Sequence, residues 1–165
     1  MSVAEAKPYR AVLTGAAGGI GQSLALALAA SCSAMLLVGR NAEKLSALRE
    51  KLVALHPDLE ILLIAADLSS DVGREATLIA AKSLPGGVNL LINNAGVSDF
   101  HAFASQPMDT VESLITTNLL SPILLCQKFL PLLQAQSNGQ IVNIGSVFGD
   151  IGYPGCHRSR CGSNR

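Results

Sequence analysis

A glycine-rich segment near the amino terminus has the composition of a phosphate-binding turn. Residues 14–21 read TGAAGGIG and lie between the apolar run RAVLT (residues 10–14) and an alternation of leucine and alanine (residues 23–30). Glycines permit a tight turn and let the backbone approach a pyrophosphate, and a following helix start offers unpaired N–H groups and a positive dipole. The spacing Gly-x-x-x-Gly-x-Gly differs from the commoner Gly-x-Gly-x-x-Gly. We therefore expect a pyrophosphate site here, and the alternative is a flexible turn without a ligand.

A single arginine follows the second apolar run. The run 34–39 ends at Gly39, and Arg40 comes next. In a dinucleotide-binding fold an acid at the end of this strand would bind the ribose 2′-hydroxyl, whereas an arginine accommodates a 2′-phosphate. Gly39 leaves the place of the acid empty, so the pair favours NADP(H), with NAD(H) as the second choice. The alternative is a solvated arginine at the start of a helix.

Polar residues also follow the later apolar runs. Asp67 ends the run 60–67, the tetrapeptide NNAG occupies residues 93–96, and Ser146 directly follows the run 140–145. Ligands of such folds bind at the carboxyl edge of the sheet, where these residues would gather. Each has a structural alternative: Asp67 could be a helix N-cap, NNAG a simple loop, and Ser146 an ordinary turn serine. Asn118 lies inside a helical pattern, where asparagine has poor propensity, and its alternative is a solvent-facing side chain.

Five strands alternate with helices along the chain. The spacing predicts helices over 23–30, over 42–56 with Asn41 as N-cap, over 71–84, and in two segments from 107 to 136. Leucine and alanine are strong helix formers, which favours a helix over a strand for 23–30. A βαβ alternation predicts a parallel sheet with right-handed crossovers. The expected strands are 10–14, 34–39, 60–67, 89–93 and 140–145.

Composition excludes several classes of protein. The chain has 165 residues, 49% of them apolar and 15% charged, with zero formal net charge. These values exclude a disordered chain, a coiled coil and a strongly basic nucleic-acid binder, and the length suits one domain. We expect no signal peptide at residues 1–10 and no membrane span, because the apolar stretch 24–30 is too short for one. Cysteines at 32, 126, 156 and 161 have no disulfide-framework spacing, which favours a cytoplasmic setting.

The motifs together resemble the short-chain dehydrogenase/reductase family. TGAAGGIG, NNAG, Asn118 and Gly145-Ser146 occur in the family's order and at its spacing, from about residue 9 to Gly155. The resemblance implies an α/β fold: a Rossmann-like three-layer αβα sandwich with a parallel sheet of about five strands in the order 3-2-1-4-5. It also implies an NAD(P)-dependent oxidoreductase that acts on a small-molecule carbonyl or secondary alcohol, with no nucleic-acid or membrane partner. Family members assemble as homo-oligomers.

The resemblance also assigns roles to individual residues. Asn118 would bend its helix and hold a water molecule for proton relay, and Ser146 would orient the substrate carbonyl. Asn94 would tie neighbouring strands together. Asp67 and the backbone of Leu68 would bind the adenine ring. The complete cofactor-binding set would be Gly15, Gly19, Ile20, Gly21, Arg40, Asp67, Leu68, Asn94, Ala95 and Gly96.

The carboxyl-terminal segment departs from the family pattern. The family continues to a Tyr-x-x-x-Lys motif, whose two positions fall on Ser159 and Ser163 here, and Tyr153 has no lysine after it. A serine hydroxyl is much less acidic than a lysine-assisted tyrosine, so we expect a truncated and catalytically incomplete chain. The alternatives are a non-catalytic dinucleotide-binding module and a non-functional fragment.

The tail itself suggests a division of the chain. Residues 1–155 would form the NAD(P)-binding domain, and residues 156–165 an aberrant basic tail with three arginines and no acid. Cys156, His157 and Cys161 supply only three ligands without a second pair at zinc-finger spacing, so we expect no metal site. Without the family's next helix, we also expect exposed apolar surface.

Overall fold

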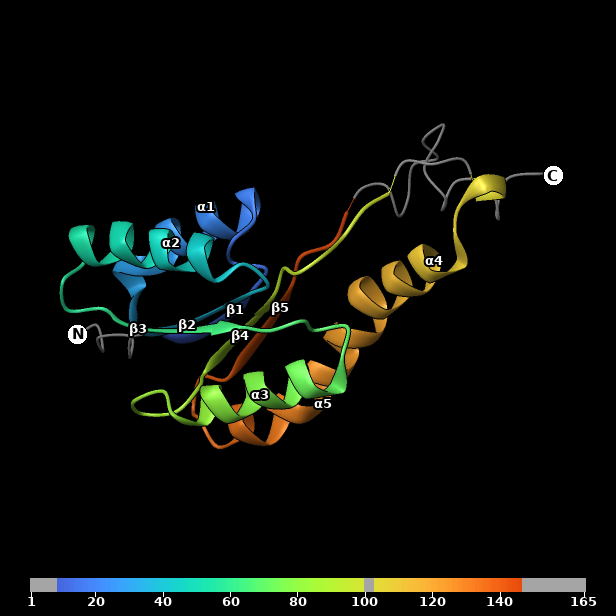
Figure 1. Ribbon diagram of the computed structural model, residues 1–165. Helices are drawn as coiled ribbons and strands as arrows, with labels where there is room; N and C mark the ends of the chain where they lie inside the picture. Colours follow the sequence, from blue (N-terminus) through green and yellow to red (C-terminus); the bar gives the residue numbers. More distant parts are fainter. Residues whose placement is uncertain (1–8, 100–102, 147–165) are drawn as a thin grey trace.

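Five parallel strands form one sheet in the order β3-β2-β1-β4-β5 (Figure 1). The structure is a computed structural model that describes residues 9–99 and 103–146. The predicted strand order is therefore confirmed, and the strand ends differ from the expected ones by three residues or fewer. The strands are β1 Tyr9–Thr14, β2 Cys32–Gly39, β3 Glu60–Ala65, β4 Leu90–Asn93 and β5 Gln140–Asn143.

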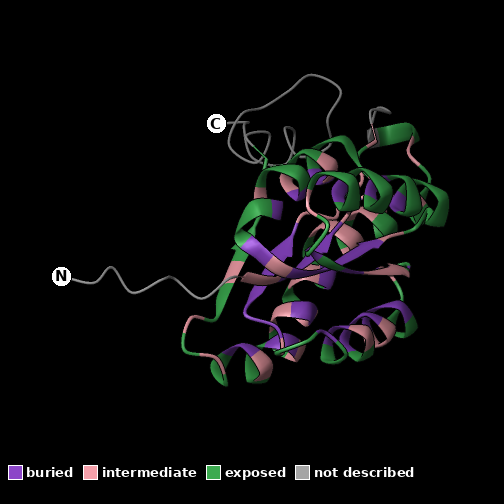
Figure 2. Cartoon of the chain, turned by 90° about the vertical axis from the view of Figure 1, so that its left-hand side faces the viewer, coloured by how far each residue is buried: buried purple, intermediate pink, exposed green. Residues whose placement is uncertain are grey.

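Helices cover both faces of the sheet and complete three layers (Figures 1 and 2). One face carries α1 (Gly19–Leu28) and α2 (Ala42–Leu55), and the other carries α3 (Asp71–Lys82) and α5 (Ser121–Gln134). The leucine–alanine alternation is helical, as predicted, and a short 3₁₀ turn at Ala29–Ser31 joins it to β2. The chain thus has the expected Rossmann-like αβα architecture.

The core is aliphatic and lies on both faces of the central strands. In β2, Met35 and Leu37 pack with α1 and α2, whereas Leu36 and Val38 pack with the α3 and α5 side. All four are fully buried, because a parallel sheet covered on both faces leaves no strand position for water. Alternate residues of one apolar run therefore serve two separate helix layers.

Side chains cap the starts of two helices. Asn41 accepts a hydrogen bond from the backbone of Lys44 and caps α2, as predicted. At α3 the cap is Ser70, which accepts from the backbone of Gly73, so the interpretation of Asp67 as an N-cap is wrong. Three residues separate an N-cap from its N3 backbone N–H, and Asp67 lies three positions too early to reach it.

The two helical segments predicted from residue 107 form one continuous helix. It consists of α4 (Met108–Ile115), a π-helical segment (Thr116–Leu120) and α5. The whole helix is long and apolar enough to cross a membrane by length and composition alone, unlike the stretch 24–30. Within α5, however, Leu125, Phe129 and Leu133 are buried against the sheet. This side of α5 belongs to the core of the αβα sandwich.

The described residues contain two free cysteines, Cys32 and Cys126. Burial raises the pKa of the Cys32 thiol to about 11, so this side chain stays protonated and unreactive at neutral pH. Residues 147–165, including the predicted tail 156–165, lie outside the described part of the chain.

Candidate functional site

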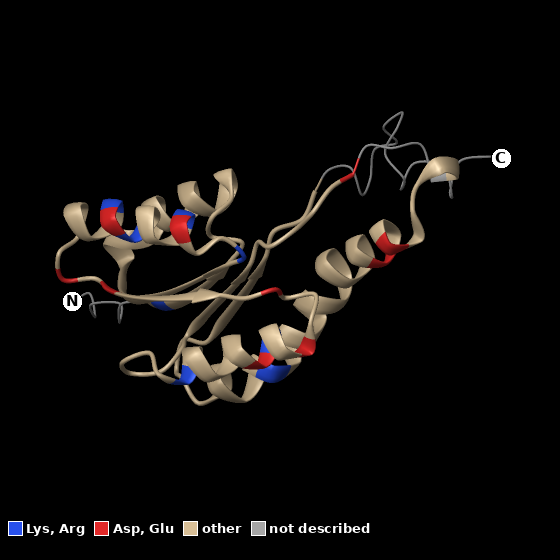
Figure 3. Ribbon diagram, in the orientation of Figure 1, with Lys and Arg blue, Asp and Glu red and all other residues tan. Residues whose placement is uncertain are grey.

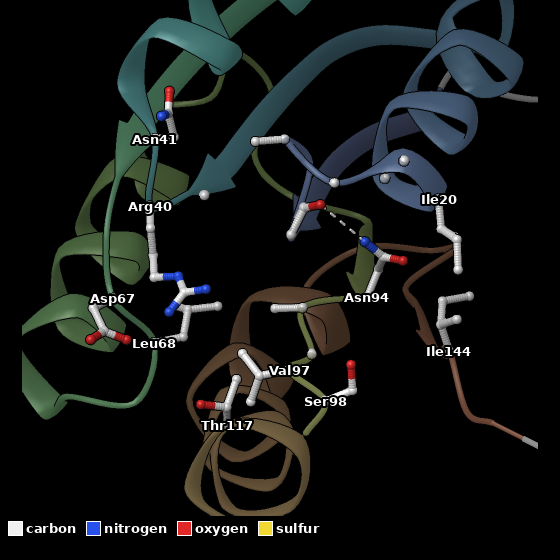
Figure 4. A pocket seen from close by; sticks show the side chains of 18 of the residues that line it. Ile20, Arg40, Asn41, Asp67, Leu68, Asn94, Val97, Ser98, Thr117 and Ile144 are labelled. Carbon is white, nitrogen blue, oxygen red and sulfur yellow. Dashed lines mark hydrogen bonds between the residues drawn. The ribbon is translucent and has the colours of Figure 1, made fainter. Parts of the chain in front are cut away.

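A pocket of about 580 Å³ lies at the carboxyl edge of the sheet (Figure 4). Its walls come from the loops that follow all five strands and from Thr117 on the long helix. All ten residues predicted to bind a cofactor line it, together with Ser146. Parallel strands end at one edge of the sheet, which explains why residues so far apart in the sequence meet there.

The glycine-rich turn shapes one wall of this pocket. Gly15 has a φ of 65°, and a Cβ at this position would lie 2.7 Å from the Cα of Ala95. A Cβ at Gly21 would overlap the backbone of Gly15, so the first turn of α1 packs directly on the β1 turn. Within the described part of the chain no side chain caps α1, and its first turn contains no acid. Its N–H groups and positive dipole are therefore available to an anion.

Thr14 and Asn94 connect the ends of β1 and β4. The Asn94 amide donates to the carbonyl oxygens of Thr14 and Gly15 at 2.9 and 3.2 Å (Figure 4). The buried Thr14 hydroxyl accepts from the backbone N–H groups of Asn94 and Ala95 at 2.9 and 3.0 Å, and donates to Ile92. These bonds hold the tetrapeptide NNAG against the glycine-rich turn.

Charged side chains gather at the β2–β3 end of the pocket. Arg40 and Lys44 line it, and Figure 4 shows the Arg40 side chain near Asp67 and Leu68. The Asp67 carboxylate accepts from the backbone N–H and the hydroxyl of Ser69 at 3.0 and 2.8 Å. These hydrogen bonds, with a smaller contribution from Arg40, lower the pKa of Asp67. Asp67 is therefore ionised at neutral pH.

Asn118 lies in the π-helical segment beside the pocket but does not line it. Its amide forms two hydrogen bonds of 2.8 Å with the backbone of Val97, one accepted from the N–H and one donated to the carbonyl. Both polar atoms of the side chain thus hold the loop after β4. Gly96 lies close by, because a Cβ there would be 3.3 Å from the Asn118 oxygen.

The opposite end of the pocket is less charged. Ser146, after β5, is exposed and lines the pocket together with Ile20 and Ile144, whose side chains lie near each other in Figure 4. Ser159 and Ser163 lie outside the described residues, as do Cys156, His157 and Cys161. Within residues 9–99 and 103–146, no three histidine, cysteine or acidic side chains gather as metal ligands do.

Sequence reasoning missed several residues of the site. Lys44 lies in the first turn of α2, four residues after Arg40, and this closeness in the sequence could have marked it as a second cation at the same end. Thr14 precedes the glycine-rich turn, yet only the contact with β4 reveals its role. The remaining lining residues adjoin predicted ones in the chain: Ala17, Gly18, Gly39, Asn41, Ala66, Val97, Ser98, Thr117, Ile144 and Gly145.

The residues of the pocket fit a pyridine dinucleotide. A Cβ at Gly15 or Gly21 would meet neighbouring backbone, the start of α1 is uncapped, and two cations line one end. An extended ligand with a central pyrophosphate would thus meet a backbone cradle in the middle and separate binding regions on either side.

Comparisons with known proteins agree with this arrangement. The family description "short chain dehydrogenase" matches residues 9–158. The chain is 30% identical over 148 residues to a very-long-chain 3-oxoacyl-CoA reductase of Emericella nidulans, with 87% of this chain and 42% of that protein covered. It is 32% identical over 149 residues to the uncharacterized oxidoreductase YxjF of Bacillus subtilis, with 88% of this chain and 56% of that protein covered. The chain thus spans about half the length of these curated relatives.

Solved structures show the same fold. A short-chain dehydrogenase from Sphingobium yanoikuyae in complex with NADPH has a TM-score of 0.82 and 30% identity, with 92% of this chain and 59% of that chain covered. A metagenomic short-chain oxidoreductase in complex with NADP has a TM-score of 0.83 and 30% identity, with 93% and 70% covered. Because the family match extends over most of the chain and includes every strand of the sheet, the chain belongs to the short-chain dehydrogenase/reductase family of oxidoreductases.

Proposed function

We propose that this chain binds NADP(H) and belongs to an oxidoreductase that acts on a carbonyl or a secondary alcohol. The observation that carries the proposal is the pocket itself: a glycine cradle and an uncapped helix start at its centre, with Arg40 and Lys44 at one end. Two relatives of known structure were solved with NADPH or NADP, which supports the same cofactor class here.

The ends of the pocket suggest how the dinucleotide lies. Arg40 and Lys44 suit the adenosine ribose with its 2′-phosphate, because no acid stands at the end of β2 to bind a 2′-hydroxyl. Asp67 and Leu68 would border the adenine ring. The nicotinamide would then extend toward Asn94, Ile144 and Ser146 at the other end.

The chain's own residues would prepare the reacting end. When bound, the nicotinamide ring would supply or accept a hydride at the substrate carbon. Ser146 would donate a hydrogen bond to the carbonyl oxygen, while the side chains of Ile20 and Ile144 would limit access of water. The side chain of Asn118 already forms two hydrogen bonds with the backbone of Val97. Asn118 would therefore contribute to a proton relay through its backbone.

We infer that proton transfer is the incomplete step. Addition of a hydride to the carbonyl carbon would leave a negative charge on the carbonyl oxygen. That oxygen would then need a proton from a group with a suitable pKa. The family's tyrosine and lysine positions hold Ser159 and Ser163, and serine is a weak acid. General acid–base help contributes about 10²–10⁴ in rate, so we expect cofactor binding with little turnover. A non-catalytic dinucleotide-binding module is the second candidate, and the same two serines favour it.

Titration with NADPH and NADH tests the proposal. We expect NADPH fluorescence to change on binding, tighter binding of NADPH than of NADH, and slow NADPH oxidation with small ketones. Absence of any NADPH binding at millimolar concentration would contradict the cofactor assignment. Turnover at ordinary enzyme rates would contradict the inferred loss of proton transfer and leave the cofactor assignment intact.

Replacing Arg40 tests the cofactor preference. Arg40→Ala removes the cation proposed for the 2′-phosphate, so we expect NADPH to bind about 10- to 100-fold more weakly while NADH binding changes little. Arg49→Ala is the matched control, because Arg49 is an exposed arginine of α2 that does not line the pocket. Equal losses for NADPH and NADH in Arg40→Ala would contradict the assignment.

A further inference from the structure

Two buried side chains meet at one backbone carbonyl in the wall of the pocket. The carbonyl oxygen of Leu68 lies 2.8 Å from the Nη1 of Arg74 on α3 and 2.5 Å from the hydroxyl of Ser121 at the start of α5. Arg74 and Ser121 are only 6% and 1% exposed. Leu68 lines the pocket, but Arg74 and Ser121 do not, so they can act on a ligand only through the position of Leu68.

Arg74 holds more than one residue of this loop. The same Nη1 atom donates to the carbonyl of Ser69 at 3.0 Å. Its ion pair with Asp71 has an N···O distance of 3.6 Å and an exposed partner, so it contributes little free energy. Burying a guanidinium is costly unless its donors find acceptors. Both carbonyls, those of Leu68 and Ser69, accept from Nη1, whereas the buried Nε has no hydrogen-bond partner among the described residues. The hydrogen bonds of the Arg74 side chain therefore go to the pocket loop.

The Ser121 hydroxyl is available to Leu68 because of the π-helical segment. The last hydrogen bond of that segment runs from the backbone N–H of Ser121 to the carbonyl oxygen of Thr116. The same carbonyl oxygen lies 2.8 Å from the Ser121 hydroxyl oxygen. Since the N–H already satisfies Thr116, the single hydroxyl proton can serve Leu68. The extra residue of a π-turn rotates the following side chains relative to a regular α-helix. This rotation brings Ser121 to face α3 and β3.

The same segment also holds the opposite wall of the pocket. Asn118 pairs with the backbone of Val97, and Thr117, the residue before Asn118, lines the pocket directly. The π-helical segment is therefore bonded to the loop after β4 through Asn118, and the first residue of α5, Ser121, is bonded to the loop after β3. The distance between Leu68 and Val97, which face each other across this end of the pocket in Figure 4, depends on both attachments.

We propose that Ser121 and Arg74 are positioning residues for the adenosine end of the cofactor. They fix the Leu68 wall, and with it the loop that carries Asp67, at a set distance from Thr117 and Val97. This inference rests on the proposed function, because it takes NADP(H) as the ligand. Leu68 lies beside Arg40 and away from Ser98 and Ile144 (Figure 4). A displacement of Leu68 should therefore weaken the binding of the adenosine half of the ligand alone.

The test compares the two halves of the cofactor in Ser121→Ala. The variant removes one of the two hydrogen bonds to the Leu68 carbonyl. We expect adenosine 2′,5′-bisphosphate and NADPH to bind about three- to tenfold more weakly, while reduced nicotinamide mononucleotide binds as it does to the unaltered chain. Isothermal titration calorimetry measures the binding of each of the three ligands separately.

Thr77→Val is the matched control. Thr77 is a buried residue of α3, and its hydroxyl donates to the carbonyl of Gly73 at 2.8 Å, outside the pocket. The Thr77→Val variant should lower the melting temperature about as much as Ser121→Ala does, without changing the affinity for either half of the cofactor. A second variant, Arg74→Lys, keeps the charge but removes the Nη1 group that donates to both carbonyls, and it should show the same selective loss for the adenosine half. Arg74→Lys also keeps the inference testable if Ser121→Ala does not fold.

The outcomes separate this inference from the proposed function. If the unaltered chain binds NADPH and Ser121→Ala and Arg74→Lys bind both halves as tightly as it does, the positioning role is wrong while the cofactor assignment stands. An equal loss for both halves would indicate general destabilisation and would also overturn the role. If the unaltered chain binds neither NADPH nor adenosine 2′,5′-bisphosphate, the proposed function fails and the inference fails with it.

Discussion

Gly15 combines two backbone requirements at a single residue. Its φ of 65° is in the left-handed region, and a Cβ would lie 2.7 Å from Ala95 on the loop after β4. Gly19, four residues later, has no atom within 4 Å of a Cβ placed on it. The two glycines of one motif therefore make different demands on the fold, which sequence spacing alone does not distinguish.

Substituting these glycines should separate their roles. Gly15→Ala strains the backbone and displaces the loop of Asn94 and Ala95, so we expect a loss of at least about 1 kcal/mol of stability and no measurable NADPH binding. Gly19→Ala should leave the melting temperature unchanged or raise it, because alanine is a better helix former. Thermal unfolding followed by circular dichroism measures both variants. Equal stability of the two would contradict the role given to Gly15.

The ionisation of Asp67 should affect stability in acid. Hydrogen bonds from Ser69 lower the pKa of Asp67 in the folded chain below the ordinary value of about 3.9. The stabilisation is therefore fully present above about pH 4 and is lost as the pH falls through the lowered pKa. Asp67→Asn should lose stability less steeply below about pH 4 than the unaltered chain does.

Denaturant unfolding at several pH values between about 2 and 6 measures this difference. Asp58→Asn serves as the control, because Asp58 is an exposed residue of the turn between α2 and β3. Identical pH profiles for Asp67→Asn and the unaltered chain would show that the Ser69 hydrogen bonds do not favour the carboxylate.

At the scale of elements, the long helix is the segment that a local pattern describes least well. Its two parts were predicted as helices, yet the π-helical segment between them depends on contacts with the loops after β3 and β4. Asparagine has poor helix propensity, and here its amide binds Val97, 21 residues away. The π-helical segment is thus a property of helix and loop together.

Replacing Asn118 should weaken this element. Asn118→Ala removes two hydrogen bonds to Val97, each contributing about 0.5–1.5 kcal/mol, so we expect a loss of about 1–3 kcal/mol in the free energy of unfolding. Ser113→Ala is the control, because Ser113 is exposed on α4 of the same helix. Urea denaturation measures both, and an unchanged midpoint for Asn118→Ala would show that the Val97 pairing is not needed.

The strand ends show how far local reasoning extends. β3 ends at Ala65 rather than at residue 67, because Asp67 begins a turn by accepting hydrogen bonds from Ser69. The N-cap of α2 and the existence of all five strands were predictable, since they depend on residues within a few positions. Sheet register and loop conformation depend on neighbours that are distant in the chain.

For the whole molecule, exposed apolar surface is concentrated on the long helix. Ile115, Leu119 and Ile123 are 54%, 52% and 56% exposed, and they follow one another at intervals of four residues. Figure 3 shows few charged residues along this helix and more on α2 and α3. The expected exposed apolar surface is therefore present in the described part of the chain.

This surface should promote self-association. We expect the mass measured by light scattering to rise with protein concentration, and a hydrophobic dye to fluoresce on binding. Ile123→Lys should reduce both effects. Ile79→Lys is the control, because Ile79 is 60% exposed on α3, away from this stripe. A monomer that binds no dye at any concentration would contradict the prediction.

The sequence by itself determined the order of strands and helices, the glycine-rich turn and the residues that gather at the carboxyl edge of the sheet. These follow from local spacing, because apolar runs, glycines and helix caps act over a few residues. Only the tertiary structure decided the partners of Thr14 and Ser121. Asn94 meets Thr14 across 80 positions, and Ser121 meets Leu68 across 53. A hydrogen bond between such distant residues depends on chain packing, so no local pattern in the sequence records it.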